Sequence, residues 1–456
     1  MSSPPSPADR ERARERARQE AGELSAEGIR RIALTWVDNA GITRTKALPT
    51  GRLARAARWG VGMSPVFDVY LVDDSSTTSP LIGGPDGDLR LFPDLDRLTS
   101  LSGQPGWAWA PVDRYDQQGL PHAGCQRLFA RRMARLAADR GLELRMGFET
   151  EWVVTRGDTA GAGLHYPTKG PAYGMTRLVE LSEYLGDLLD ALISQRVEVL
   201  QIHPEYAPGQ FEVSVSPADP VRAADLAVLV RETVRAVSVR HGLATSFAPT
   251  VEPGSVGNGG HLHLSVWRDG VNLCRDGDGP CGMTSVAEGF LAGVLRALPA
   301  LLAIGAPSPA SYLRLEPSRW AGVFQCWGVE NREAAIRFVP GAPDDPAGAN
   351  AEIKCFDSAG NPYLVTGAVI AAGLDGVDAG LALPPPVSGD PVHSERVPRL
   401  PMSLPEALRH FESSAVLREA LGEALFGAVD AVRRAEVDLF AGAGPEHIAA
   451  ATRWRY

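Results

Sequence analysis

Cysteine is scarce in this sequence, and its few cysteines do not form a known motif. The 456 residues include five cysteines, an odd number, and no two of them form a CxxC pair. A disulfide framework and a zinc site built from thiolates are therefore excluded as organising features. Sparse, unpaired cysteine suits a reducing cytoplasm, which is the location we expect.

Long apolar runs and an excess of basic residues are also missing. No apolar run approaches the roughly 18 residues that cross a bilayer, and the N-terminus is polar. The 45 Lys and Arg residues are outnumbered by 55 Asp and Glu residues, which gives a formal net charge of −10. Because nucleic acids and anionic membranes attract basic surfaces, we expect neither as a main partner.

The composition is that of an ordinary globular protein, with 44% hydrophobic and 22% charged residues. Residues 1–25 alternate in charge without an apolar stripe and are expected to form a flexible arm or a solvated helix. Short β-type runs such as 32–38 and 66–73, separated by Gly, Pro and Asp turns, predict a small β-rich domain over 26–121. The larger domain then spans 122–456.

Helical periodicity recurs in the larger region, with short alternating runs between the helices. This order favours an α+β domain with antiparallel strands over a regular βαβ winding. The expected helices cover 125–140, 176–195, 220–241, 284–303, 362–379 and 405–440, the last broken near Gly422–Gly427.

Four short runs place ionisable side chains on one face of a strand and apolar side chains on the other. In residues 142–152 the polar face carries Glu149 and Glu151, roughly 7 Å apart. The other three polar faces carry, in chain order, Glu212 with Glu205 just upstream; His261, His263 and Ser265; and Glu352 and Lys354.

A single strand of this kind is usually a solvated outer face, but four of them weaken that interpretation. If the faces converge, their carboxylates raise one another's pKa values unless a cation neutralises them. Oxygen ligands with one imidazole suit Mg²⁺ or Mn²⁺ better than zinc or copper. Spacing alone does not show that the faces converge.

Two further segments could bind an anionic ligand. The loop before His261 contains Gly254, Gly257, Gly259 and Gly260, which permit close backbone approach or simply make a turn. Arg332 and Arg337 lie five residues apart in a strand-like run. Guanidinium groups beside a carboxylate cluster suit a polyphosphate, although both could be ordinary surface arginines.

Five motifs, in this order, resemble the glutamine synthetase family in its bacterial type I form and its γ-glutamyl-amine ligase relatives. They are MGFETEW, HPEYAPGQFE, GNGGHLHLS, NREAAIR and AEIKCFDSAGNPYLVTGAVIAAGLDG. The resemblance extends from about Ile29 over nearly the whole chain. It implies an N-terminal β-grasp domain and a catalytic domain with an antiparallel sheet and surrounding helices. It also implies a homo-oligomer of two six-subunit rings, in which one N-terminal domain helps to close the neighbour's site.

The resemblance also implies roles for individual residues, with ATP as co-substrate and two or three Mg²⁺ or Mn²⁺ ions per site. One cation would be held by Glu151, Glu205 and Glu212, and the second by Glu149, His261 and Glu352. Nucleotide and phosphate contacts fall to His263, Ser265, Arg332 and Arg337. The amino acid would be bound by Arg314, Gly257, Lys354 and Glu151, and the catalytic group comprises Arg332, Glu212 and Arg314.

The chain departs from the family pattern where true glutamine synthetases bind ammonium. Ser64 stands where they carry an aspartate, and Trp320 stands where they carry a flap glutamate. Ammonium needs anions around it, whereas an aromatic wall suits a larger amine. At the acid end Lys354 replaces an arginine and Val256 an asparagine, and glutamate remains the expected acid.

We therefore expect an ATP-dependent ligase that joins the glutamate γ-carboxylate to an organic amine, such as a polyamine or ethanolamine, through γ-glutamyl phosphate. Its place would be in nitrogen metabolism. One alternative is a true glutamine synthetase in which Glu316 or another nearby acid compensates. Another is a catalytically silent member of the family.

Overall fold

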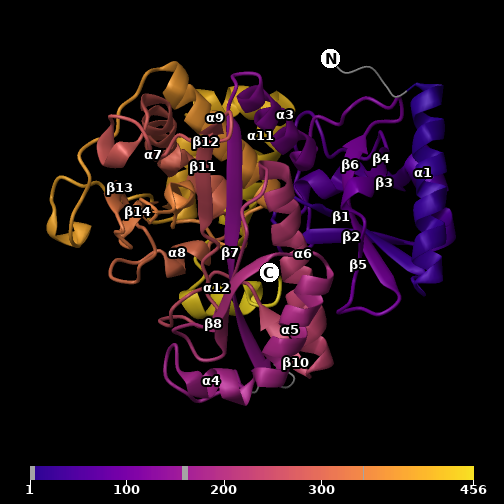
Figure 1. Cartoon of the computed structure of the whole chain (residues 1–456), viewed down its shortest axis with the longest axis horizontal. Helices are drawn as coiled ribbons and strands as arrows, with labels where there is room; N and C mark the ends of the chain where they lie inside the picture. The colour runs from indigo at the N-terminus through magenta and orange to yellow at the C-terminus, as the bar shows by residue number, and fades with distance from the viewer. Residues whose placement is uncertain (1–5, 157–162, 343) are drawn as a thin grey trace.

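The computed structural model describes residues 6–156, 163–342 and 344–456. Two β-sheets organise the chain, one in the N-terminal quarter and one in the remainder, and helices cover the larger sheet (Figure 1). The α+β prediction is confirmed.

The N-terminal sheet has the strand order β2-β1-β6-β4-β3, with β5 on β6. Strands β1 and β6 pair in parallel, and the other pairs are antiparallel. Short helix α2 (Leu53–Trp59) connects β2 toward β3. The strands are β1 (Arg31–Val37), β2 (Thr43–Pro49), β3 (Val61–Met63), β4 (Leu89–Pro93), β5 (Thr99–Ser100) and β6 (Trp107–Tyr115).

The prediction of a strand over 66–73 is wrong, because this segment begins as a 3-10 helix, Pro65–Val69. The Ser64 hydroxyl accepts the Val66 N–H, and Pro65 occupies the first helical position. Both features start helical turns, and they override the β propensity of the valines and aromatic residues.

Residues 7–26 form helix α1 (Pro7–Ala26), so of the two alternatives the helix is confirmed and the flexible arm is wrong. Ser6 and Asp9 make a reciprocal capping box at its start. Ala17 and Leu24 are buried in the same apolar cluster as Ile32 and Leu34 of β1. Ala13 and Ala21 also pack against this cluster, so the buried face is a stripe made mostly of alanine. Because alanine is only weakly apolar, the sequence pattern indicated a solvated segment.

The larger sheet has the strand order β13-β14-β15-β11-β7-β9-β8, with β10 on β7 and β12 on β11. Only β13 and β14 pair in parallel among its described strands, as expected for a sheet without βαβ winding. Its strands are β7 (Glu143–Arg156), β8 (Val199–Pro204), β9 (Gln210–Val215), β10 (Leu243–Ser246), β11 (Leu262–Arg268), β12 (Val271–Asn272), β13 (Phe324–Val329), β14 (Ala334–Val339) and β15 (Asn350–Ile353).

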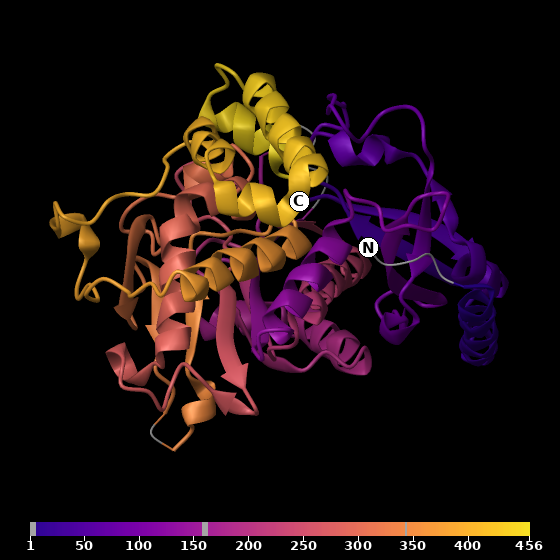
Figure 2. The same cartoon turned by 90° about the horizontal axis from the view of Figure 1, so that it is seen from above.

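The predicted helices are confirmed, including the break expected near Gly422, and two of them are divided at points that were not predicted. The segment 176–195 divides into α4 and α5, and 405–440 divides at Ser413–Ser414, with a further non-helical residue at Gly422. Figure 2 shows the C-terminal helices gathered on one side of the sheet. The helices are α3 (Gln126–Ala138), α4 (Met175–Glu180), α5 (Ser182–Ser194), α6 (Pro220–Arg240), α7 (Ser285–Gly305), α8 (Ser311–Arg314), α9 (Pro362–Asp378), α10 (Leu404–Glu412), α11 (Ala415–Leu439) and α12 (Pro445–Thr452).

Helix α7 corrects the expectation that no segment is apolar enough to cross a bilayer. Helix α7 is long and apolar enough to cross a membrane, but 78% of its most apolar 18-residue window is buried inside the protein. Apolar residues of α7 such as Phe290 and Leu298 belong to the large core cluster that also contains Leu262 and Ile353. A helix buried on nearly all sides becomes apolar all round without a membrane.

Helices α7 and α9 approach closely where Gly293 faces Gly376. A Cβ atom on Gly293 would lie 2.2 Å from the Ala372 carbonyl oxygen and 2.7 Å from Gly376 Cα. We expect Gly293→Ala to lower the free energy of unfolding by about 1–3 kcal/mol, because backbone must move to admit the methyl group. Urea denaturation at fixed protein concentration measures it.

Gly186→Ala is the matched control, because Gly186 lies in helix α5 and its Cβ would meet nothing within 4 Å. There the same change should stabilise the protein by about 0.5–1 kcal/mol through helix propensity. Equal stability of the two variants would contradict the close approach.

Candidate active site

The four strands singled out by their polar faces are neighbours in the larger sheet, in the order β15-β11-β7-β9. The register sets Glu151 opposite Glu212 and His263 opposite Glu352. A cavity of about 610 Å³ lies over this face. Its titratable lining from these strands and β8 comprises Glu149, Glu151, His203, Glu205, Glu212, His261, His263 and Glu352.

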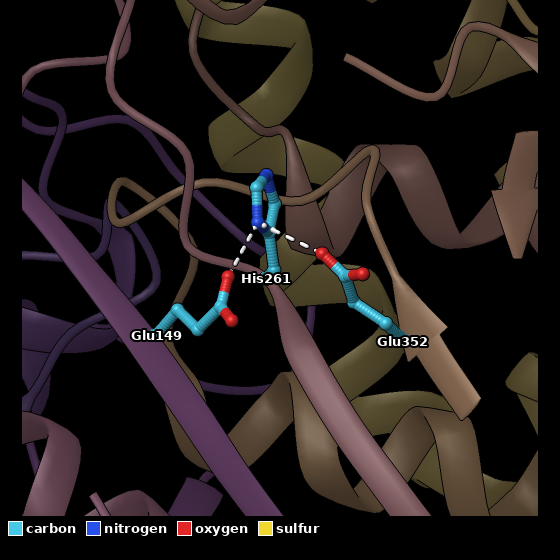
Figure 3. Close-up of side chains that lie close together, drawn as sticks. All are labelled: Glu149, His261 and Glu352. Atoms are coloured by element: carbon cyan, nitrogen blue, oxygen red, sulfur yellow. Dashed lines mark hydrogen bonds and ion pairs between the residues drawn. The ribbon is translucent and has the colours of Figure 1, made fainter. Parts of the chain in front are cut away.

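Glu149, His261 and Glu352 form the first group of candidate metal ligands. His261 Nδ1 lies 2.8 Å from Glu149 Oε2 and 3.1 Å from Glu352 Oε1. Figure 3 shows the imidazole between the two carboxylates, which come from β7 and β15, the strands on either side of β11. Their ligand atoms lie within 4.8 Å of one another, so one cation could contact all three. The structure thus brings together the residues predicted to hold the second cation.

The second group is His203, Glu205 and Glu212. His203 Nδ1 lies 3.6 Å from Glu205 Oε1, and its Nε2 lies 3.4 Å from Glu212 Oε1. The sequence analysis missed His203, although it stands two residues before Glu205 with only Pro204 between. A histidine so close to a candidate ligand was the signal that could have found it.

Glu151, the third predicted ligand of that cation, lies outside both close groups. It accepts hydrogen bonds from the Gly259 N–H at 2.9 Å and the Gln210 amide at 3.1 Å. Its Oε1 lies 4.0 Å from His261 Nε2, between the two groups. Its role as a ligand stays a prediction.

The electrostatics of the cavity suit cations. Burial, with added repulsion from Glu212 and Glu205, raises the pKa of Glu151 to about 7. Burial also raises the pKa of Glu205. For Glu149, burial is outweighed by hydrogen bonds from His261 and His263, which lower its pKa below the usual value. Carboxylate oxygens with one imidazole in each group are a donor set that fits Mg²⁺ or Mn²⁺.

The basic residues at the cavity divide into paired and unpaired. Lys354 Nζ lies 2.9 Å and Arg337 Nη1 3.2 Å from the Glu352 carboxylate. Arg314 is buried and donates to the Cys355 and Phe356 carbonyls at 3.0 Å each. Arg332 has no ion pair within the described segments and lies over the Trp320 ring. It is therefore free to meet an anionic ligand.

His263 connects the cavity to a neighbouring hollow of about 440 Å³. Glu149, His263 and Asn350 line both spaces. His263 Nδ1 lies 2.9 Å from Asn350 Oδ1, and Ser265 lines the hollow further along β11. These two predicted nucleotide-binding residues thus lie in one continuous surface.

The glycine loop packs tightly behind the acidic groups. A Cβ atom on Gly257 would lie 2.1 Å from the Pro249 carbonyl oxygen and 2.7 Å from the Arg314 side chain. One on Gly259 would lie 2.5 Å from His261 Nε2. Any larger residue at either position would displace Arg314 or His261.

Aromatic side chains form one wall of the cavity. Trp320 packs edge-on against Tyr206, with ring centres 5.6 Å apart, and Tyr206 packs against Tyr173 at 5.3 Å. The Tyr173 hydroxyl donates to Glu205. The sequence analysis found Trp320 but missed both tyrosines, which no strand pattern marks. Ser64 is not among the described residues that line this cavity in its own chain, and its place in the amine pocket stays a prediction.

Comparison with known proteins identifies the family. Residues 123–448 match the model described as "Glutamine synthetase, catalytic domain". The chain belongs to the glutamine synthetase family. The gamma-glutamylpolyamine synthetase GlnA3 of Streptomyces coelicolor is 55% identical over 100% of this chain and 99% of that protein. A glutamine synthetase of Clostridium saccharobutylicum is 29% identical over 90% of this chain and 92% of its own.

Solved structures of glutamine synthetase relatives share the fold. A crystal structure of a novel glutamine synthase homolog superposes with a TM-score of 0.84 at 32% identity, covering 94% of this chain and 99% of that one. A GmaS/ADP complex superposes with a TM-score of 0.81 at 28% identity, covering 92% and 96%. Family members use ATP and divalent metal ions, and the two acidic groups described above could bind such ions.

Proposed function

We propose that this protein is a γ-glutamylpolyamine synthetase, which joins the γ-carboxylate of glutamate to an amino group of a polyamine with hydrolysis of ATP. The observation that carries the proposal is the 55% identity, over the full chain, to a gamma-glutamylpolyamine synthetase. The aromatic wall of Tyr206 and Trp320 supports it, since methylene chains and ammonium groups both bind well against rings.

The reaction needs the carboxylate to be activated, because an ionised carboxylate is a poor acyl donor. In our proposal a γ-carboxylate oxygen attacks the γ-phosphorus of ATP, ADP leaves, and γ-glutamyl phosphate forms. The amine nitrogen then attacks the γ-carbonyl carbon, inorganic phosphate leaves, and the nitrogen loses a proton. Divalent cations held by the two acidic groups would offset the negative charge that gathers between the phosphates and the carboxylate.

Individual residues have distinct tasks in this scheme. Arg332 binds the transferred phosphoryl group, and Arg337 assists from its pair with Glu352. His263 and Ser265 bind the nucleotide, with ATP lying across the neighbouring hollow. Arg314, Lys354 and the Gly257 backbone hold glutamate. Glu212 is placed to contact both a cation and the incoming amine.

The remaining expectations complete the proposal. The domain boundary lies near Pro121, just before the matched catalytic region. The enzyme is cytoplasmic and assembles from identical subunits, with twelve as the expected number. Ser64 then reaches the amine pocket of a neighbouring subunit.

The second candidate is a glutamine synthetase that uses ammonium. It is favoured by one observation, that Glu316 lines the cavity beside Trp320 and could replace the missing flap glutamate. Phosphate release with glutamate, ATP and Mg²⁺, assayed in turn with ammonium, putrescine, spermidine and ethanolamine, separates the two. Activity with ammonium alone would overturn the polyamine proposal.

Trp320→Glu tests what the aromatic wall does. Under our proposal it should lower kcat/KM for spermidine about tenfold, because the ring contact is lost, and raise the use of ammonium. Trp320→Phe keeps an aromatic ring and serves as the control. If Trp320→Glu left kcat/KM unchanged for both spermidine and ammonium, the aromatic wall would not determine which amine is used.

A further inference from the structure

A separate hollow of about 440 Å³ adjoins the catalytic cavity at Trp320. Trp320 and Arg332 line both spaces. The other walls of this hollow come from residues 329–333 and 387–390. We call it the acid hollow, because Glu330, Glu333 and Asp390 line it.

The charges in the acid hollow are not balanced. Glu330 is paired with Arg337, so its charge is offset. Glu333 and Asp390 have no ion pair in the described part of the chain, and Arg332 is the single basic residue in the lining. If Arg332 binds phosphate as proposed, two carboxylates remain to attract a cation.

Glu333 lacks a partner that its position calls for. Glu333 is buried, with 6% of the residue exposed. One carboxylate oxygen, Oε1, accepts the Trp320 backbone N–H at 2.8 Å, whereas Oε2 has no hydrogen-bond partner. An unpaired buried carboxylate oxygen is costly, so a donor from a ligand would stabilise it.

The Glu333 carboxylate also positions Trp320, which lines both the catalytic cavity and the acid hollow. Through its bond to the Trp320 N–H, Glu333 holds a residue whose backbone has a positive φ of 54°. A non-glycine residue in that conformation needs support from its surroundings. Trp320 remains 47% exposed as a residue and lines both the catalytic cavity and the acid hollow.

We propose that the acid hollow binds the distal ammonium group of a di- or polyamine whose reacting amino group lies in the catalytic cavity. The methylene chain passes the Trp320 ring, and the far ammonium group lies between Glu333 and Asp390. The inference rests on the proposed function and narrows its substrates to amines with a second cationic nitrogen. Ethanolamine and monoamines lack that group and gain nothing from the hollow.

The double variant Glu333→Gln/Asp390→Asn removes the charges and keeps the shapes. Glutamine can still accept the Trp320 N–H, and asparagine can still accept the Val392 N–H that Asp390 caps. We measure kcat/KM for spermidine, putrescine and butylamine, the last having the carbon chain of putrescine with one amino group. The expected result is a loss of about tenfold for spermidine and putrescine, with butylamine changed less than twofold.

Two single variants make the comparison specific. Glu395 is an exposed acid in the same segment as Asp390, and it lines neither space. Glu395→Gln should therefore leave kcat/KM unchanged for all three substrates. Glu316→Gln removes a charge from the catalytic cavity itself. Glu316→Gln could lose the preference for spermidine and putrescine over butylamine while the double variant kept it. The distal ammonium would then bind elsewhere, and the inference would be overturned.

The remaining outcomes separate the inference from the proposed function. An equal loss for butylamine and spermidine in the double variant would assign Glu333 a purely structural role and overturn the inference. The wild-type enzyme could use spermidine while the double variant kept the same ratio of kcat/KM for spermidine to kcat/KM for butylamine. That result would overturn the inference and leave the proposed function standing. A wild-type enzyme active with ammonium alone would overturn both.

Discussion

Glu149→Ala should lower kcat for the ligase reaction by about 10³-fold or more. Glu149 contributes one of the three ligand atoms in the first acidic group and also contacts His263, with Oε1 2.9 Å from Nε2. Its loss removes a cation ligand and frees both histidines to change orientation. Charge stabilisation by a bound metal is worth several kcal/mol in reactions of this kind, which supports a loss of this size.

Two measurements check this prediction. Phosphate release with glutamate, ATP, spermidine and Mn²⁺ gives the rate, and titration calorimetry with MnCl₂ should show weaker binding. Glu143→Ala is the matched control, because Glu143 lies on the same strand but is exposed and outside the cavity. Full activity of Glu149→Ala would contradict the metal assignment. A wild-type protein without activity on any amine or ammonium would instead favour the catalytically silent alternative.

Arg332→Ala should lower kcat/KM for ATP by about 10³-fold and leave the stability of the protein unchanged. An arginine on a transferred phosphoryl group typically contributes a factor of 10³ or more. Arg332 has no ion pair in the described residues, so its removal leaves no buried carboxylate without a partner. The combination of a large kinetic effect and a small change in unfolding free energy is therefore expected.

Arg319→Ala is the control for Arg332, because Arg319 lines the same cavity and its polar contacts are exposed: an ion pair with Glu316 at 3.8 Å and a hydrogen bond to the Gly254 carbonyl at 3.2 Å. In Arg319→Ala, kcat/KM for ATP should change by less than about threefold. Arg314→Ala should behave differently from both, since Arg314 bridges two buried carbonyls and its loss would destabilise the fold. A large loss of stability in Arg332→Ala would show that the side chain is structural.

Much of the site followed from local patterns. Period-two alternation placed Glu149 with Glu151 on one strand face and His261 with His263 on another, and the structure has strands β7 and β11 there. Motif order identified the family, and the resemblance joined Glu149, His261 and Glu352 into one group that the structure brings together. These features were accessible because they depend on residue identity and short spacing, which each strand fixes by itself.

Other features had no local signal. Tyr206 follows Glu205 without any periodic pattern, and Tyr173 reaches Glu205 from a loop more than 30 residues away. The burial of α1 depends on Ala13, Ala17, Ala21 and Leu24, a stripe in which alanine gives only a weak apolar signal. The 3-10 turn after Ser64 depended on capping chemistry that its β-forming residues concealed.

The sequence by itself determined the family and the identities of the candidate ligands, and it predicted that Trp320 stands in place of a flap acid. Only the tertiary structure decided that strands β15, β11, β7 and β9 are neighbours, and so that their acidic faces share one cavity. It also decided that Glu333 supports Trp320 and lines a second hollow. The physical reason is that hydrogen-bonded register and close packing join residues far apart in the chain, whereas local spacing constrains only those within a single element.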